Sequence, residues 1–329
     1  MYFRFIHFLK ITVRVCAILG AMMIATASQA TVYFVDQNKT TDPGVSGSGL
    51  GDWSQAFMTF EEALLSASAG DTIRIAEGTY TPNDLFRTFD QTQTYLIDKT
   101  LIILGGYEGE GGLSLLNRDP KVFLTILSGD FQNPPDSAFT FDRDYLTDPS
   151  RVDNAFTVVT VLEVTDGTRI EGFIIERGNR GTYSGSNASG YRGGGMLIDD
   201  SQMDVVNCTF RFNAVGIPGL DSPGENGVTS DGGGASVRGG KKVANITRYT
   251  RFINCTFHDN FAARGGGLSL VDGSPTDVTT QVKVVNSLFY DNQALEMSEA
   301  DILVTDGCGP TIVICNSIFR SELALSIFE

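Results

Sequence analysis

A short pattern of alternating apolar and polar residues recurs in the second half of the chain. It reads VVNCTFRFN at 205–213, returns as FINCTFHDN at 252–260 and as VVNSLFYDN at 284–292, and recurs in part at 313–319. Alternation with a period of two predicts β-strands. Because the unit recurs every 30 to 47 residues, we expect supersecondary units that stack and bury one shared core.

Equivalent positions of the copies carry the same residue types. In all four copies an Asn is followed three residues later by a Phe, and the first three copies have a second Asn. We expect the aromatic residues to form one inward ladder with a spacing of about 4.8 Å. They are Phe210, Phe257, Phe289 and Phe319. Asn suits the corners of such units because it tolerates left-handed backbone, and stacked amides can hydrogen-bond to one another.

A glycine triplet followed by a short apolar strand precedes each of the first three copies, at 193–198, 232–237 and 265–270. Two or three short strands per repeat, with Gly or Asn at the corners and no helical period between them, predict an all-β solenoid, a parallel β-helix. The alternative is a β-sandwich whose internal similarity is coincidental. That alternative does not account for so many matched offsets.

The first part of the predicted domain contains one helix. Thr59 and Glu62 form a capping box, one side of the following segment is apolar, and Gly70 is expected to end it. A β-helix leaves an open apolar end, so we expect this helix to cover the N-terminal one. Further strands are predicted at 31–36, 71–80, 101–104, 123–127, 156–161 and 170–175.

Residues 1–30 have the features of an export signal. Three basic residues precede the apolar run 15–27, which is too short to span a bilayer, and small residues ending at Ala30 resemble a cleavage site. An uncleaved anchor is the alternative. We therefore predict a signal peptide over 1–30 and a single β-helix domain over 31–329, with the cap and first coil in 31–100 and further coils in 101–329. We expect the last coil to be incomplete at the C-terminus, where the chain is either truncated or meets a partner.

The charge of the chain limits its partners. The formal net charge is −15, and removing the three basic residues of 1–30 lowers it by three to −18. An acidic surface of this size repels nucleic acid and anionic lipid. Neither is therefore expected as a partner.

Four cysteines follow the signal segment: Cys208, Cys255, Cys308 and Cys315. Cys208 and Cys255 occupy the same position of successive repeats, so we expect them to stack as small buried residues. A disulfide between stacked positions is the alternative, although it strains the bridge geometry. No spacing resembles a zinc site, and no metal or other cofactor is predicted.

Several segments resemble a known family. They are GDWS at 51–54, TFEEA at 59–63, GDTIRIAEGTY at 70–80, GGY at 105–107, RDP at 118–120 and TILSGD at 125–130. Together they resemble exported bacterial right-handed parallel β-helix proteins of the pectin-lyase-like superfamily. The later Gly-Gly and Phe-x-x-Asn pairs are similar to the repeats of polymorphic outer membrane proteins. Met196, Ser236, Ser269 and Glu322 depart from those repeats. The resemblance implies a right-handed fold and a secreted or outer-membrane location, but no particular reaction.

Long connections between repeats are the first place to look for a binding site, because insertions in a solenoid emerge as loops on one face. One corner is lengthened between 175 and 193 and again between 213 and 232; a second corner is lengthened at 238–248 and 272–280. Tyrosines beside arginine and carboxylates suit sugar stacking and hydroxyl binding. The predicted ligand-binding residues are Tyr183, Tyr191, Arg192, Asp221 and Asp231. Polar loops with no ligand are the alternative.

No catalytic residue is assigned. A lyase on this scaffold needs a basic proton acceptor near a carboxylate–calcium cluster, and a hydrolase needs paired carboxylates. The candidates for such roles are Asp199, Asp200, Asp272 and Lys241. His258 is interpreted as an exposed strand residue. The acidic loop at 136–153 lacks the spacing of a calcium loop, so we expect a solvated excursion, with calcium binding as the alternative.

The combined prediction is an exported or surface β-helix protein that acts as a non-enzymatic adhesive or glycan-contacting module. Its expected partner is a cell-surface or environmental glycan. Outer-membrane association is expected through a segment or partner that this chain does not contain. The alternative function is a polysaccharide lyase or glycoside hydrolase acting on an acidic polysaccharide.

Overall fold

The computed structural model of the chain divides into two compact units, Met1–Ala30 and Thr31–Glu329. The structure describes residues 29–42, 45–82, 90–131, 148–180, 191–216, 230–239, 249–271, 281–294, 301–304, 311–320 and 325–327. The predicted signal peptide therefore lies almost entirely outside the described residues. Among the described residues, none of the helices has the length and apolar character needed to cross a membrane.

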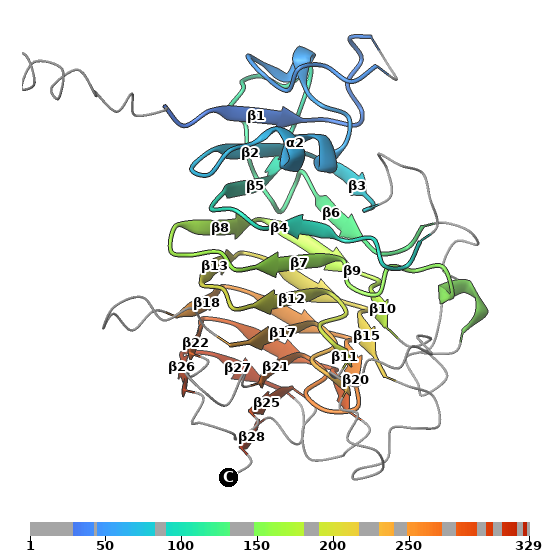
Figure 1. Cartoon of the computed structure of the whole chain (residues 1–329), viewed down its shortest axis with the longest axis vertical. Helices are drawn as coiled ribbons and strands as arrows, with labels where there is room; N and C mark the ends of the chain where they lie inside the picture. The colour runs from blue at the N-terminus through green and yellow to red at the C-terminus, as the bar shows by residue number, and fades with distance from the viewer. Residues whose placement is uncertain are drawn as a thin grey trace, which may run out of the picture. The chain divides into compact units, whose positions relative to one another are not determined.

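Strands that are far apart in the sequence stack side by side into three parallel sheets (Figure 1). We name these sheets A, B and C in the order in which the chain visits them. Sheet A contains β1 (Val32–Val35), β2 (Thr72–Ala76), β5 (Ile102–Tyr107), β8 (Thr168–Glu171), β13 (Met203–Val206), β18 (Thr250–Ile253), β22 (Gln281–Val285) and β26 (Thr311–Cys315).

Sheet B contains β3 (Gly78–Tyr80), β6 (Thr125–Ser128), β9 (Phe173–Glu176), β14 (Thr209–Arg211), β19 (Thr256–His258), β23 (Leu288–Tyr290) and β27 (Ile318–Phe319). Sheet C contains β4 (Tyr95–Ile97), β7 (Val159–Leu162), β12 (Met196–Asp199), β17 (Ala235–Arg238), β21 (Leu268–Val271), β25 (Ile302–Val304) and β28 (Leu325–Ile327). Within the described residues the chain passes from sheet A to sheet B to sheet C seven times. The predicted parallel β-helix is confirmed.

Two small sheets lie in the connection from sheet B to sheet C. One contains β10 (Asn179–Arg180), β15 (Ala214–Val215), β20 (Phe261–Ala262) and β24 (Gln293–Ala294). The other pairs β11 (Tyr191–Arg192) with β16 (Ser230–Asp231). The chain reaches β11 and β16 through long connections, so both lie where the sequence predicts a lengthened corner.

The predicted aromatic ladder runs through the core of sheet B. The rings of Phe210 and Phe257 are parallel with centroids 4.7 Å apart, and those of Phe257 and Phe289 are 4.6 Å apart. Phe319 continues the stack at 4.9 Å. These distances match the spacing of neighbouring strands. The register of the repeat therefore fixes the core.

The two asparagines of the repeat have different roles. The first, represented by Asn207 and Asn254, adopts positive φ at the tight corner between sheets A and B, and its amide bonds the next one along the stack. The second is buried: Asn213 Nδ2 donates to Asn260 Oδ1 at 3.0 Å, and Asn260 Nδ2 donates to Asn292 Oδ1 at 3.0 Å. These interior amides also bond backbone carbonyls, so they satisfy polar groups that the corner would otherwise leave unpaired.

The cysteine prediction is confirmed for the two stacked residues. Cys208 and Cys255 are free and buried, and Cys315 is free and exposed. Burial raises the pKa of the Cys208 thiol to about 11 and raises that of Cys255 well above its ordinary value. Both groups therefore behave as small apolar side chains. Cys308 lies outside the described residues.

The predicted helix is present but shorter than expected. Thr59 and Glu62 form the capping box of α2 (Phe60–Ser66), and the apolar side of α2 joins the main core. The helix ends at Ser66 rather than at Gly70, because Ala67 is already extended; Gly70 adopts positive φ in the turn that follows. α2 packs against β1 and β4, the first strands of sheets A and C, which agrees with the predicted position of a cap.

Two of the predicted strands are in fact two strands each. The segment 71–80 contains both β2 and β3. The segment 170–175 spans the end of β8, a corner at Gly172 and the start of β9. Gly172 has a φ of +83°, and a Cβ atom there would lie 2.8 Å from the ring of Pro120. Glycine at this corner has no side chain to clash with Pro120. The apolar–polar alternation of β8 therefore runs directly into that of β9, and the sequence pattern does not reveal the corner.

Candidate functional site

The candidate site lies on the outer face of sheet C, where the predicted loop residues and the predicted carboxylates meet. In β12 and β17, alternate residues such as Met196 and Val237 enter the core. The residues between them point outward, and the register places Asp199 beside Arg238 on the next strand. A parallel stack thus brings together side chains that are 39 residues apart in the sequence.

Asp199 and Arg238 form an ion pair. Arg238 Nε donates to Asp199 Oδ1 at 2.8 Å, and Nη2 contacts the second carboxylate oxygen. The hydrogen bonds that Arg238 donates to Asp199 are the main reason that the pKa of Arg238 is raised, and the charge of Asp200 adds to this effect. Asp200 follows in a left-handed conformation, with a φ of +44°. One predicted carboxylate is therefore paired, and the other lies next to it.

A second ion cluster lies where the long connections enter sheet C. The Asp231 side chain is fully buried, and Arg264 donates to its Oδ1 from both Nε and Nη2 at 2.9 Å. Arg192 Nε lies 3.5 Å from its Oδ2. Burial lowers the pKa of Arg192, against the opposing charge of Asp231, and the positive charges of Arg238 and Arg264 lower it further. The three guanidinium groups therefore act on one another.

We call Arg192, Arg238 and Arg264, with Asp199 and Asp231, the arginine face. Two serines lie beside it: Ser269 Oγ donates to Ser236 Oγ at 2.8 Å, and both side chains are fully buried. A Cβ atom on Gly232 would lie only 2.6 Å from Ser269 Oγ, so the glycine triplet passes directly over this serine. The serines that depart from the repeat pattern are thus outward residues covered by the chain, not defects in the core.

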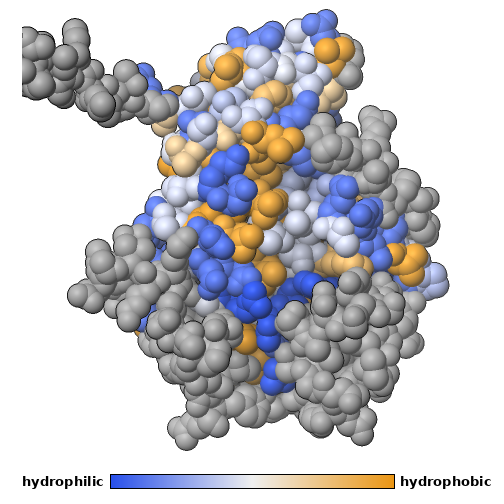
Figure 2. Space-filling view, in the orientation of Figure 1, coloured by the Kyte–Doolittle hydropathy of each residue, from blue (hydrophilic) through white to orange (hydrophobic). Residues whose placement is uncertain are grey.

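The face changes character along the stack. Its earlier strands present Leu96 and Leu162, which are 43% and 37% exposed. Figure 2 shows apolar surface down the middle of this side of the molecule, giving way to hydrophilic surface over the later strands. An apolar area next to oriented guanidinium groups suits a ligand that has both apolar faces and acidic or hydroxyl groups.

The comparisons with known proteins add little to this geometry. No protein-family model matches the chain, and neither does any curated protein. Among solved structures it is similar to the pectate lyase Pel9A, with 17% sequence identity and a TM-score of 0.42; the match covers 87% of this chain and 62% of that one. A rhamnogalacturonan lyase matches with 15% identity and a TM-score of 0.35, over 80% of this chain and 69% of that one.

The chain thus spans only 62% of the pectate lyase chain. Similarity at this level says nothing about what this chain binds or catalyses. The fold follows from the stacked parallel sheets, and the site from the contacts of the arginine face.

The structure brings some of the predicted site residues together. Arg192 and Asp231 are neighbours and form an ion pair, and the Asp231 side chain is fully buried. Of the predicted catalytic candidates, Asp199 and Asp200 lie at the arginine face. The remaining predictions fall on side chains outside the described residues, namely Tyr183, Tyr191, Asp221, Asp272 and Lys241.

Two arginines of the site were not predicted. Arg238 occupies the position of Asp199 one coil later, so aligning the glycine triplets would have revealed the pair. Arg264 directly precedes the third triplet, as Arg192 precedes the first and Asp231 the second. That alignment was available in the sequence. What it could not show is that these three side chains turn toward one another.

His258 is less exposed than predicted, because its side chain is only 14% exposed and stacks on Tyr290.

In the acidic loop, Asp148 accepts a hydrogen bond from the Ser150 backbone at 2.8 Å and caps a short helix, η3 (Pro149–Arg151), while Asp153 is buried. Within the described ranges, no three His, Cys, Asp or Glu side chains are grouped as a metal site.

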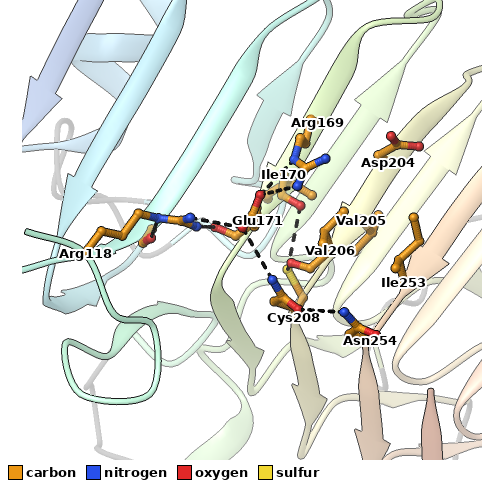
Figure 3. A network of polar contacts seen from close by, with 12 residues as sticks. Arg118, Arg169, Ile170, Glu171, Asp204, Val205, Val206, Cys208, Ile253 and Asn254 are labelled. Carbon is orange, nitrogen blue, oxygen red and sulfur yellow. Dashed lines mark hydrogen bonds and ion pairs between the residues drawn. The ribbon is translucent and has the colours of Figure 1, made fainter. Parts of the chain in front are cut away.

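A further charged network, on sheet A, shows what ordinary ion pairing looks like in this fold. Arg118 Nη1 donates to Glu171 Oε1 at 3.0 Å, and Arg169 Nε donates to its Oε2 at 2.8 Å (Figure 3). The amide of Asn207 approaches the same carboxylate at 3.4 Å and links it to the corner asparagines. This network ties coils together along the stack.

Proposed function

We propose that the protein is a non-enzymatic, glycan-contacting module and that the arginine face is its contact surface. The observation that carries this proposal is a group of three ion-paired guanidinium groups, one on β17 of sheet C and two in the connections that lead into sheet C. A guanidinium fork recognises carboxylate and hydroxyl groups geometrically, and a buried counter-ion orients it before a ligand arrives. An acidic polysaccharide supplies carboxylate and hydroxyl groups of this kind.

The pairing of the site argues against turnover. A general base must hold a deprotonated group within hydrogen-bond reach of the substrate proton. Arg238 is unsuitable because Asp199 raises its pKa. Asp199 and Asp231 are each bound to a guanidinium group, so neither is placed as half of a hydrolase's carboxylate pair.

One observation favours the alternative, a polysaccharide lyase. Burial lowers the pKa of Arg192, which is the direction that a basic proton acceptor needs. Incubating the protein with polygalacturonate and following the ultraviolet absorbance of unsaturated ends separates the two functions. Product whose release is abolished in Arg192→Lys would replace the binding proposal with the enzymatic one.

Binding itself is tested by titrating protein produced from the full chain with oligogalacturonates. Arg238→Gln and Arg192→Lys are expected to weaken binding by about 5- to 20-fold, since each removes charge-assisted hydrogen bonds. Arg251→Gln is the matched control, because Arg251 is also ion-paired with an aspartate but lies on sheet A. Binding that is absent, or that falls equally in all three variants, would contradict the proposal.

We further propose that the protein is exported and acts at the cell surface or in the medium. The support is the basic and apolar pattern of residues 1–30, which ends in small residues at Ala30. N-terminal sequencing of protein recovered from the medium and from the envelope tests this directly. A first residue of Thr31 is expected, and a chain that begins at Met1 inside the cell would rule out export by cleavage.

A further inference from the structure

A second surface lies on the outer face of sheet B. The arginine face belongs to sheet C and the connections into it, so the two surfaces are on different sheets. The outward residues at the ends of the sheet B strands form one row in register: Glu176, Arg211, His258 and Tyr290, one from each of four successive coils. We call this row the histidine column. Because parallel strands are stacked, like positions recur about every 4.8 Å along it.

The two rings of the histidine column stack on each other. His258 and Tyr290 are parallel within 2° with centroids 4.8 Å apart, so each covers a face of the other. Phe212 meets His258 edge to face at 6.0 Å, and the Arg211 guanidinium lies over the Phe212 ring at 5.6 Å. What remains available at the surface is polar: a phenol hydroxyl, imidazole nitrogen and guanidinium N–H groups.

An apolar column runs beside the polar one. Two residues earlier in each strand, the outward positions are aliphatic or threonine and are partly exposed. They are Ile126, Ile174, Thr209, Thr256, Leu288 and Ile318. The corner that leads into sheet B in these later coils is a tight turn with Asn in left-handed conformation. No long connection therefore enters this face from that corner within the described coils.

Four carboxylates and three arginines surround the histidine column, and several of them pair with one another. Glu176 accepts from Arg211 Nε at 2.6 Å and lies 3.3 Å from Arg177 Nε, while Arg177 also contacts the buried Asp130. His258 Nδ1 lies 2.7 Å from Asp259. Asp291 and Arg320 add one charge of each sign near Tyr290. A ligand of either net charge would have to compete with these partners.

We propose that this face of sheet B binds a neutral glycan chain that lies along the stack, with its hydroxyl groups on Arg211, His258 and Tyr290 and its apolar C–H surface on the neighbouring aliphatic column. The ligand must be amphipathic and rich in hydroxyl groups, because the face alternates apolar and hydrogen-bonding rows over a few ångströms. A second copy of the chain is disfavoured as the occupant, since each copy carries a net charge of −15. The site is independent of the arginine face and takes the other class of glycan.

The test uses the imidazole of His258 as a reporter. The chain has two histidines, and the other, His7, lies in the predicted signal peptide. Hexasaccharides of glucose, xylose and mannose are titrated into protein produced from the full chain, and the His258 ring signals are followed by NMR. We expect at least one neutral hexasaccharide to shift them, and saturating oligogalacturonate to leave that titration unchanged.

Two variants locate the contact. Tyr290→Phe keeps the ring stack and removes one hydroxyl, so binding should weaken about 3- to 10-fold. Thr256→Glu places a charge in the apolar column and should abolish binding. The matched control is Tyr249→Phe, because Tyr249 contacts Lys283 on sheet A and should leave binding unchanged. Far-ultraviolet circular dichroism verifies that each variant is folded.

The outcomes separate the possibilities. No shift of the His258 signals with any neutral hexasaccharide, or equal affinity of the wild type and Tyr290→Phe, would overturn the proposal and leave the column as internal stacking. Displacement of the neutral sugar by oligogalacturonate would also overturn it, because one shared site would then serve both. Loss of oligogalacturonate binding in the arginine-face variants, with neutral binding intact, would leave this second site standing by itself.

Discussion

Two regions of the molecule place one carboxylate between two arginines, and they do so in different surroundings. On sheet A, Glu171 lies between Arg118 and Arg169 with 12% of its side chain exposed (Figure 3). At the entrance to sheet C, Asp231 lies between Arg264 and Arg192 and is fully buried. The chemistry of the two clusters is the same, so the difference lies in the corners that carry them.

Glu171 directly precedes the tight corner at Gly172, where the chain turns without an insertion. Water can reach the pair, and such pairs contribute little to stability. Asp231 lies at the end of a long connection, just before a glycine triplet that crosses close over sheet C. A lengthened corner can therefore bury an ion pair, whereas the ion pair at a tight corner remains partly exposed to solvent. The buried pair is expensive to break and holds its arginines in one orientation.

The largest expected difference comes from removing each carboxylate. Asp231→Ala should lower the free energy of unfolding by about 3–5 kcal/mol, because it leaves two arginines without their buried counter-ion. Glu171→Ala should lower it by about 1–2 kcal/mol. Urea unfolding at neutral pH measures both. Equal losses would show that the two corners do not differ in the way their burial implies.

Replacing an arginine of each cluster by lysine should have a smaller effect on the free energy of unfolding. Arg264 binds Asp231 through two nitrogens at 2.9 Å, so Arg264→Lys should lower the free energy of unfolding by about 1–2 kcal/mol while keeping the charge. Arg169→Lys on sheet A should change it by less than about 0.5 kcal/mol. Thermal unfolding of the two variants side by side is sufficient. A larger loss for Arg169→Lys would reverse the comparison.

The pH dependence of stability separates the exposed cluster further. Burial tends to raise the pKa of Glu171, but hydrogen bonds from Arg169 and Arg118 overcome it, and the net shift is downward. A lowered pKa contributes stability above the unfolded value of about 4.3, and that stability is lost as the pH falls through the lower folded value. Glu171→Gln should lower the free energy of unfolding by about 1 kcal/mol at pH 7 and by less at pH 3. A constant deficit across this range would contradict the assignment.

The smallest effect concerns the tight corner itself. Asn254 has a φ of +54°, which glycine adopts freely and alanine does not. Asn254→Gly should remain within about 0.5 kcal/mol of the wild type, whereas Asn254→Ala should lose about 1 kcal/mol. Chemical denaturation of the two Asn254 variants measures these losses. An equal loss in the glycine variant would mean that the amide ladder, rather than the backbone conformation, maintains the corner.

Much of the fold could be predicted because its signals are local. A Phe three residues after each Asn fixes which side of the strand faces inward, since strands alternate with a period of two. The capping box at Thr59 marks the helix start for the same reason: Thr59 and Glu62 bond each other within one turn. Because the repeats have the same pattern, equivalent residues of neighbouring coils stack on one another. Phe257 therefore lies on Phe210.

The sequence could not show which outward residues would be covered. Ser236 and Ser269 alternate like solvent-facing residues, yet both are buried, and Gly232 of the neighbouring coil lies directly over Ser269. Gly172 divides one continuous alternation into two strands, because it keeps the backbone clear of Pro120. Each outcome depends on a segment brought close by the coil, and alternation along one strand carries no information about it.

The sequence by itself determined the repeat, the inward ladder and the corner asparagines, because each depends on residues within one repeat or on the same position of the next. The tertiary structure alone decided that Asp231 is a buried counter-ion of two arginines. Arg192 and Arg264 are 72 residues apart, and they meet at one carboxylate only because three successive coils stack their connections from sheet B to sheet C. Burial of a charge is a property of everything packed around it, and so it cannot be derived from the order of residues along one strand.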